Sequence, residues 1–109
     1  MGAINFELIF REIKDEVINI IAANHKDLKD EIVPDISTFL DNVKDKLKQY
    51  TLQLADNDIG TSDFQYNVAG LKELCEMKVL QERGIEQIKI DKIKDQIVSS
   101  IASSIIDKL

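Results

Sequence analysis

The chain contains 109 residues, of which 44% are hydrophobic and 31% are charged, with one Pro and four Gly. This composition is typical of one folded domain spanning residues 1–109, and it excludes disordered, collagen-like and loop-dominated chains. Twenty acidic against fourteen basic residues give a net charge of −6. The average field therefore repels phosphate groups, and we expect no nucleic-acid partner.

The sequence favours a cytoplasmic protein without a signal peptide or a transmembrane segment. Cys75 is the only cysteine, so the chain forms no internal disulfide and suits a reducing compartment. The segment Met1–Phe10 lacks the basic start of a signal peptide, and an acidic side chain interrupts its apolar run. The longest uncharged, mostly apolar stretch, Gln96–Ile106, has eleven residues, whereas a membrane-spanning helix needs about 20. We therefore expect no transmembrane segment.

Apolar residues recur every three or four positions along nearly the whole chain, a spacing typical of amphipathic helices. In the first segment this pattern predicts a helix from about Ile4 to Ala23. Asn24 ends the stripe, and Pro34 disfavours helical geometry at the residue before it. We expect a break or kink between Asn24 and Pro34, and the path of the chain there stays open.

A second stripe predicts the most regular helix of the chain. Its members are apolar or aromatic and follow alternating steps of four and three: Ile36, Leu40, Val43, Leu47, Tyr50 and Leu54. The segment Asp56–Gly60 ends this helix, because Asn, Asp and Gly tolerate left-handed backbone geometry. The acidic residues around Gly60 do not match a calcium loop, which needs glycine at its sixth and glutamate at its twelfth position. We interpret them as turn and capping residues.

The third predicted helix begins after Ser62, which has the capping-box spacing relative to Gln65. It runs from Asp63 to about Arg83 and ends at Gly84. Gly70 lies in the middle of this helix, where glycine costs about 1 kcal/mol relative to alanine. We therefore expect Gly70 to permit the close approach of another helix.

The remaining chain predicts a fourth helix. Between Ile85 and Ile90 the apolar residues alternate loosely, which is compatible with a short extended or frayed stretch. From Asp91 to Leu109 the spacing is helical again. Four amphipathic helices joined by short connections predict an all-α fold, a small antiparallel helical bundle whose helix axes cross at about 20°.

The residues supply no recognisable catalytic or metal-binding motif, so we expect a non-enzymatic protein without cofactor or metal. His25 is the only histidine, and no local context pairs it with Cys75 as a base beside a thiol. One histidine cannot supply both Glu-x-x-His motifs of a di-iron bundle, although Glu73 and Glu76 share a helix face. We interpret His25 as a helix-end residue and both glutamates as solvated surface.

Two segments carry more apolar surface than one helix stripe needs. At 100° per residue, the third predicted helix has one apolar face around Leu71 and a second, roughly opposite face formed by Tyr66, Met77 and Leu80. Either this helix is central and buries both faces, or the second face binds a partner or a ligand. The uncharged segment Gln96–Ile106 carries small residues that allow another helix to approach, within the chain or in a dimer. The candidate interaction residues are Tyr66, Met77, Leu80, Ile101, Ile105 and Ile106.

These patterns predict an interaction module that binds a protein partner, most simply a second copy of itself, through apolar helix faces. One alternative is an acidic inhibitor or immunity-type protein that neutralises a basic partner. Its binding residues would be Asp27, Asp30, Glu31, Asp35, Asp41 and Asp45. A second alternative is reversible lipid-surface binding through the amphipathic C-terminal helix, which the acidic charge and the lack of Trp disfavour.

Overall fold

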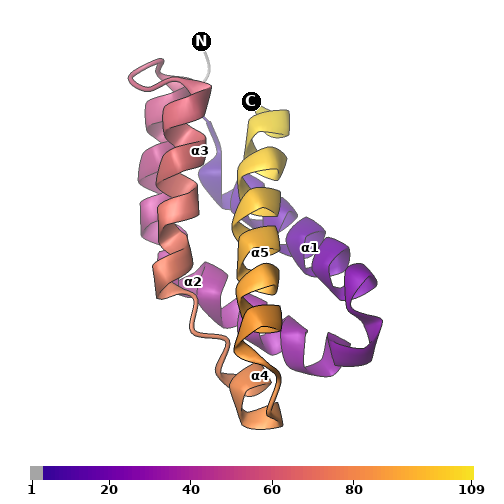
Figure 1. The fold of residues 1–109 in the computed structure, drawn as a ribbon. Helices are drawn as coiled ribbons and strands as arrows, with labels where there is room; N and C mark the ends of the chain where they lie inside the picture. The colour runs from indigo at the N-terminus through magenta and orange to yellow at the C-terminus, as the bar shows by residue number, and fades with distance from the viewer. Residues whose placement is uncertain (1–3) are drawn as a thin grey trace.

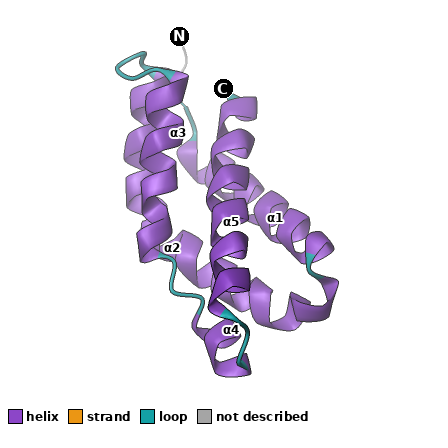
Figure 2. Ribbon diagram, viewed as in Figure 1, coloured by secondary structure: helices purple, strands orange, loops and turns teal. Residues whose placement is uncertain are grey.

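The computed structural model describes residues 4–109, and in this range the chain forms helices and turns but no β-strand (Figures 1 and 2). The α-helices and 3-10 helices (η) are, in order, α1 (Phe6–Asn24), η1 (Lys26–Leu28), α2 (Lys29–Ala55), α3 (Thr61–Gly70), η2 (Leu71–Leu74), α4 (Lys78–Arg83) and α5 (Gln87–Lys108). The predicted all-α helical bundle is confirmed. The expected number of helices is corrected from four to five within the described residues, because the third predicted helix is divided.

The first helix, α1, follows the predicted apolar stripe and begins two residues later than expected. The Asn5 side chain caps it by accepting a hydrogen bond from the Leu8 amide at 3.2 Å, which satisfies one of the free donors of the first turn. Its buried residues are Phe6, Phe10, Ile13, Val17, Ile21 and Ala22. Of the segment compared with a signal peptide, residues 1–3 lie outside the described range, and residues 6–10 belong to α1.

The break expected between Asn24 and Pro34 lies at the start of this range, at His25. His25 leaves helical geometry, η1 follows, and α2 starts at Lys29. Pro34 lies inside α2 near its start. There it withholds one backbone hydrogen bond from the Asp30 carbonyl, and Asp30 is exposed, so water can replace the missing donor. The helix therefore continues through the proline.

The turn between α2 and α3 occupies the predicted position, but its capping differs from the prediction. Asn57 adopts a left-handed conformation with φ of 62°, and α3 begins at Thr61. The Gly60 amide donates to the Asp63 carboxylate at 3.2 Å, which is the contact that a residue in the third helical position supplies. The expected capping box of Ser62 and Gln65 is therefore wrong, because the helix starts before Ser62.

The third predicted helix is not continuous. After α3 and η2 the chain unwinds through residues 75–77, where Met77 has φ of 54°, and then enters the short helix α4. Gly84, with φ of 84°, ends α4 at the predicted position. The stretch before Asp91, whose structure the pattern left open, is helical from Gln87 onward.

Burial explains the unwinding. Leu71 and Leu80 are nine residues apart and would lie on opposite faces of a continuous helix, yet they are 3% and 0% exposed. The unwound segment rotates α4 relative to α3, so that both leucines and Met77 enter one core. Burying a Leu or Met side chain contributes about 1.5–3 kcal/mol, so Met77 and Leu80 together outweigh the roughly 1–2 kcal/mol cost of one left-handed residue.

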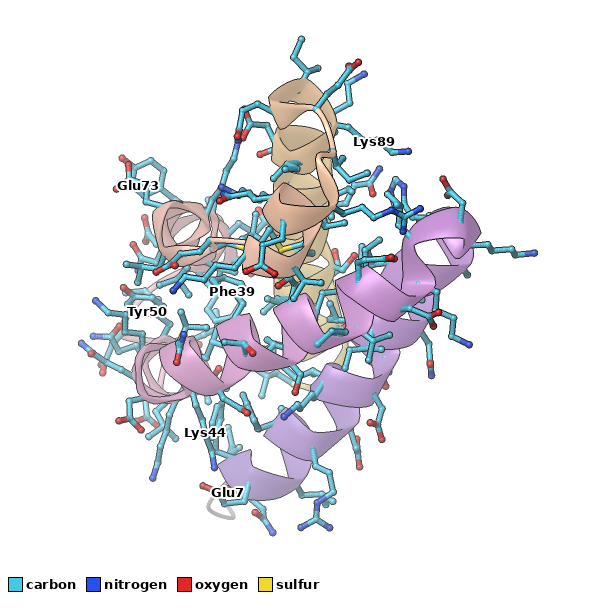
Figure 3. All side chains as sticks on the ribbon, turned by 90° about the horizontal axis from the view of Figure 1, so that it is seen from below. Glu7, Phe39, Lys44, Tyr50, Glu73 and Lys89 are labelled. Carbon is cyan, nitrogen blue, oxygen red and sulfur yellow. The ribbon has the colours of Figure 1, made fainter. Side chains whose placement is uncertain are left out.

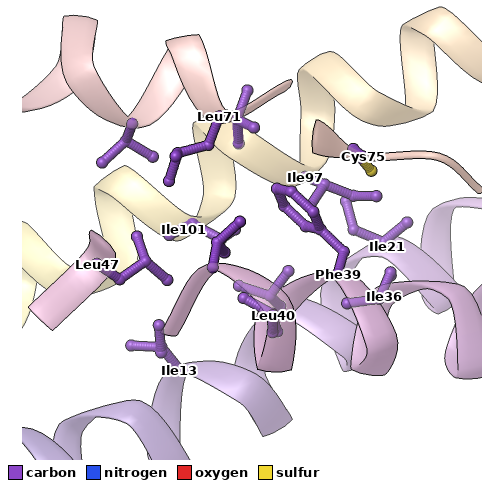
Figure 4. Close-up of a cluster of buried hydrophobic side chains, with 14 of the residues drawn as sticks. Ile13, Ile21, Ile36, Phe39, Leu40, Leu47, Leu71, Cys75, Ile97 and Ile101 are labelled. Atoms are coloured by element: carbon purple, nitrogen blue, oxygen red, sulfur yellow. The ribbon is translucent and has the colours of Figure 1, made fainter. Parts of the chain in front are cut away.

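The helices pack around one connected cluster of buried apolar side chains. α1 lies against α2 and α5, α3 lies against α5 and α2, and α4 packs on α2. Figure 1 shows α5 running beside α3, and Figure 3 shows α1 and α2 diverging from the turn that joins them. Figure 4 shows where the helices meet, with Ile13 from α1, Leu47 from α2, Leu71 from η2, and Ile101 from α5. Leu47, a member of the predicted apolar stripe of α2, is fully buried.

Gly70 does not bring two helices of this chain together. A Cβ atom built on Gly70 meets no atom within 4 Å, apart from its chain neighbours and its own helix backbone. The residue is exposed and has ordinary helical geometry, with φ of −62°. Close packing within the chain is therefore the wrong explanation for this glycine.

Candidate interaction surface

Most of the candidate interaction residues lie in the core. Met77 and Leu80 are 3% and 0% exposed, because the break before α4 turns them inward. Ile101 and Ile105 are fully buried on the inner face of α5, and Ile106 is half-buried against the same core. Of the two possibilities that the pattern left open, burial within the chain is correct for Met77, Leu80, Ile101 and Ile105.

Tyr66 differs from the other candidates because its side chain is 80% exposed. It lies on α3, and Gly70 and Leu74 follow it at spacings of four residues on the same side of the chain. Leu74 is also exposed. The other exposed large hydrophobic side chains lie on α1 and at the two ends of α5: Leu8, Ile20, Ile88 and Leu109. Single exposed apolar residues are common on protein surfaces, but Tyr66 and Leu74 also line one hollow together.

Tyr66 stands at the rim of a shallow hollow between α2 and the α3–η2 segment. We call this hollow, of about 340 Å³, the Tyr66 hollow; its lining residues are Lys46, Tyr50, Tyr66, Asn67, Gly70, Leu71, Glu73 and Leu74. Figure 3 shows Tyr50 and Glu73, which come from its two walls, on the same side of the molecule. The lining combines two aromatic rings and two leucines with one basic and one acidic group, a composition typical of protein interfaces.

The helix positions explain why these side chains converge. On α2, Lys46 and Tyr50 are one turn apart and share a face. On the facing segment, Tyr66 and Gly70 are also one turn apart in α3, and Leu74 follows at the end of η2. Gly70 carries no side chain, so the space between the walls stays open at this point.

A second hollow of about 280 Å³ adjoins the first and shares Leu74 with it. Its wall includes Asp35, which is 7% exposed. Both carboxylate oxygens of Asp35 accept backbone hydrogen bonds at 3.0 Å, one from Val79 and one from Leu80. α4 has no side-chain cap of its own, so a residue of α2 supplies its capping group. This carboxylate therefore has a structural role in joining α2 to α4.

The acidic residues considered for binding a basic partner are mostly engaged within the chain. Besides Asp35, Glu31 pairs with Arg83, Asp41 with Lys14 at 2.8 Å, and Asp27 with Lys89 at 3.8 Å. Three of the six acidic residues thus form ion pairs within the chain, and of these Asp27 and Asp41 stay 74% and 59% exposed. Asp30 and Asp45 are exposed and form no ion pair within residues 4–109.

The C-terminal helix presents little apolar surface for a lipid bilayer. Its apolar stripe faces α1 and α3, with Ile97, Val98, Ile101, Ala102 and Ile105 buried. Ser99 and Ser103 are exposed and, with Ala69 of α3, line a shallow hollow between α3 and α5. No helix within residues 4–109 is long and apolar enough to cross a membrane.

The side chains that could take part in catalysis or bind a metal ion lie apart from one another. Burial raises the pKa of the Cys75 thiol to about 12, so the thiol stays protonated and covered by the core. The His25 imidazole shares a 2.8 Å hydrogen bond with the Gln96 side chain, which links the end of α1 to α5. No group of three His, Cys, Asp or Glu side chains in the described part of the chain could hold a metal ion. Glu73 and Glu76 also have different surroundings: Glu76 pairs with Lys78 at 3.1 Å, and Glu73 lines the Tyr66 hollow.

No family model matches the chain, and comparison with curated proteins and with solved structures gives no match either.

The sequence identified Tyr66 but missed the hollow beside it. Tyr50 belongs to the predicted apolar stripe of α2, but it is half-buried and lines the hollow. Lys46 and Glu73 carry no sequence signal of their own, because charged residues are common on helix surfaces. The available signal was the combination of an exposed aromatic residue with a glycine one turn later.

Proposed function

We propose that this chain is a non-enzymatic protein–protein interaction module that associates with a second copy of itself through the surface around Tyr66. One observation carries the proposal: the most exposed large hydrophobic side chain within residues 4–109, Tyr66, stands at a hollow that Tyr50, Leu71 and Leu74 help to line. Aromatic residues are enriched in protein interfaces, where they dominate binding energy. The single buried thiol, Cys75, suits the cytoplasm as the compartment.

The surface properties fit a protein partner better than the two alternatives. The Tyr66 hollow contains one basic and one acidic residue, so it is locally neutral although the whole chain carries a net charge of −6. A locally neutral, aromatic patch desolvates at low cost. An acidic inhibitor needs accessible carboxylates, and a lipid-binding helix needs an exposed apolar stripe. Three of the six candidate carboxylates pair with basic side chains of the same chain, and Asp35 caps α4. Most of the apolar stripe of α5 is buried.

Sedimentation velocity over a range of protein concentrations tests the proposal. We expect the wild-type chain to associate reversibly, and the Tyr66→Ser variant to require at least about tenfold more protein to do so. Ile88→Ser is the matched control, because Ile88 is also an exposed large apolar residue, at 70%, but does not line the hollow. A wild-type chain that stays monomeric at its highest soluble concentration would refute self-association. Equal effects of both substitutions would refute the assignment to Tyr66.

A further inference from the structure

We propose that two copies associate about a two-fold axis, with Tyr66 of each copy inserted into the Tyr66 hollow of the other. This inference rests on the proposed function and names the geometry and the occupant of the hollow. In a two-fold dimer the same patch faces itself, so it must carry both a projection and a matching depression. Tyr66 is the projection, and the adjoining hollow is the depression.

The dimensions and lining of the hollow suit a phenol ring. Its volume of about 340 Å³ lies near the lower limit for sites that hold whole small molecules, which is enough for one tyrosine side chain. Leu71 and Leu74 contribute apolar lining, and Tyr50 supplies a ring for an offset or edge-to-face contact with the incoming tyrosine. Insertion would cover Tyr66 of one copy and Leu74 of the other, which are both exposed in the single chain.

Gly70 is the second observation that points to an incoming partner. Its backbone has ordinary helical geometry, and an added Cβ meets no atom within 4 Å, so the isolated chain has no need for glycine here. Gly70 is the last residue of α3, and a glycine whose backbone conformation also suits alanine costs about 0.4–1 kcal/mol through the entropy of the unfolded chain. A side chain at this position would project into the space that the tyrosine of the second copy occupies. The close approach that Gly70 permits is therefore between two copies.

The charges at the walls of the hollow are complementary under the same symmetry. Lys46 lies on the α2 wall and Glu73 on the η2 wall. A two-fold axis along the groove between these walls places the α2 wall of one copy opposite the η2 wall of the other. Each Lys46 then faces Glu73 of the second copy, and the dimer gains two ion pairs related by symmetry. Within residues 4–109, neither residue forms an ion pair inside its own chain.

Filling the hollow tests the inference without harming the isolated fold. In Gly70→Gln a longer side chain enters the hollow from its floor, and we expect self-association to weaken at least about tenfold. The thermal midpoint of the dilute protein should stay the same or rise, because glutamine is a better helix former than glycine. A loss of association together with a lower midpoint would be explained by damage to the fold, so charge reversal provides an independent measurement.

The charge reversals are Lys46→Glu and Glu73→Lys, made in separate chains. Each variant alone places like charges opposite each other across the axis, so its self-association should weaken. In an equimolar mixture the two variants should form mixed dimers, since every reversed position then faces an opposite charge. Sedimentation of the mixture, with one variant labelled, measures this preference.

The outcomes separate the two proposals. If the wild-type chain associates but neither Gly70→Gln nor charge reversal changes the association, the two-fold insertion of Tyr66 is wrong while self-association stands. If each reversed variant weakens association and mixing does not restore it, the Lys46–Glu73 pairing and its axis are wrong. A monomeric wild-type chain overturns the proposed function and this dimer together. Weakening by Gly70→Gln with recovery in the mixed dimer supports the inference.

Discussion

Removing the Asp35 carboxylate should detach α4 from α2 and destabilise the fold. Asp35 is 7% exposed and accepts hydrogen bonds from the Val79 and Leu80 amides, both at 3.0 Å. Hydrogen bonds to a charged group contribute about 1.5–3 kcal/mol each, so two of them set an upper value of roughly 3–6 kcal/mol. Val79 is half-buried, so water can replace part of its bond. We therefore expect Asp35→Ala to reduce the free energy of unfolding by about 2–4 kcal/mol.

The two amides identify the mechanism of this loss. α4 has only six residues, which are too few to form a stable helix without tertiary contacts. Hydrogen exchange at the Val79 and Leu80 amides should therefore accelerate in Asp35→Ala more than exchange at the amides of α1. Asp35→Asn retains one good acceptor oxygen and should lose about half as much stability. Unfolding in urea at low protein concentration, followed by circular dichroism, measures the free energies without a contribution from self-association.

An exposed aspartate on the same helix provides the control for this measurement. Asp45 is exposed on α2, and Asp45→Ala should change stability by no more than about 0.5 kcal/mol. If Asp35→Ala costs no more than Asp45→Ala, or if exchange of the Val79 and Leu80 amides is unchanged, then the capping role of Asp35 is incorrect.

Three further substitutions or reactions test other contacts. The buried Thr51 hydroxyl has no hydrogen-bond partner within the described residues, so Thr51→Val should raise the free energy of unfolding, measured in urea, by about 1 kcal/mol. Thr51→Ser keeps the hydroxyl and should not raise it. Cys75, whose pKa burial raises to about 12, should react with a thiol reagent at pH 8 only after unfolding, and rapid reaction of the native protein would contradict its burial. A hydrogen bond from Lys44, at 2.7 Å, lowers the pKa of Glu7. Its stabilisation is therefore present above the unfolded pKa of Glu7 and disappears as the pH falls through the lowered folded value, so the stability difference between Glu7→Gln and wild type should close in acid and shrink in salt.

The parts of the fold that the sequence predicted are those with local signals. The apolar stripes fixed the buried faces of α1 and α2, and residues that tolerate left-handed geometry marked the ends of α2 and α4 at Asn57 and Gly84. These signals depend on neighbouring residues, so spacing and residue type were sufficient. Pro34 was the exception, because a proline near an exposed helix start costs only one hydrogen bond that water can replace.

The break between α3 and α4 could not be predicted from local residue types. It contains neither glycine nor proline, and Met77 adopts the left-handed conformation that glycine usually supplies. Two long-range factors stabilise it: burial of Met77 and Leu80 in the common core, and the Asp35 cap, which lies 44 residues before Val79. A phase slip in the apolar pattern was the available signal. The second apolar face of the predicted helix was evidence for unwinding rather than for a partner.

This unwinding leads to a direct test with Leu80→Asp. On a continuous helix Leu80 would lie on the face opposite Leu71, and an aspartate there would disturb only an interface with a partner. In the structure Leu80 is fully buried, and an unpaired carboxylate in the core costs several kcal/mol, a large part of the roughly 5–15 kcal/mol stability of a small domain. We expect Leu80→Asp to lose its cooperative thermal transition, whereas Tyr66→Ser keeps the wild-type transition and loses only association. A folded Leu80→Asp with the wild-type midpoint would show that Leu80 lies on the surface and that the helix continues through Met77. The surface around Tyr66 would then no longer be the main exposed apolar region of the chain.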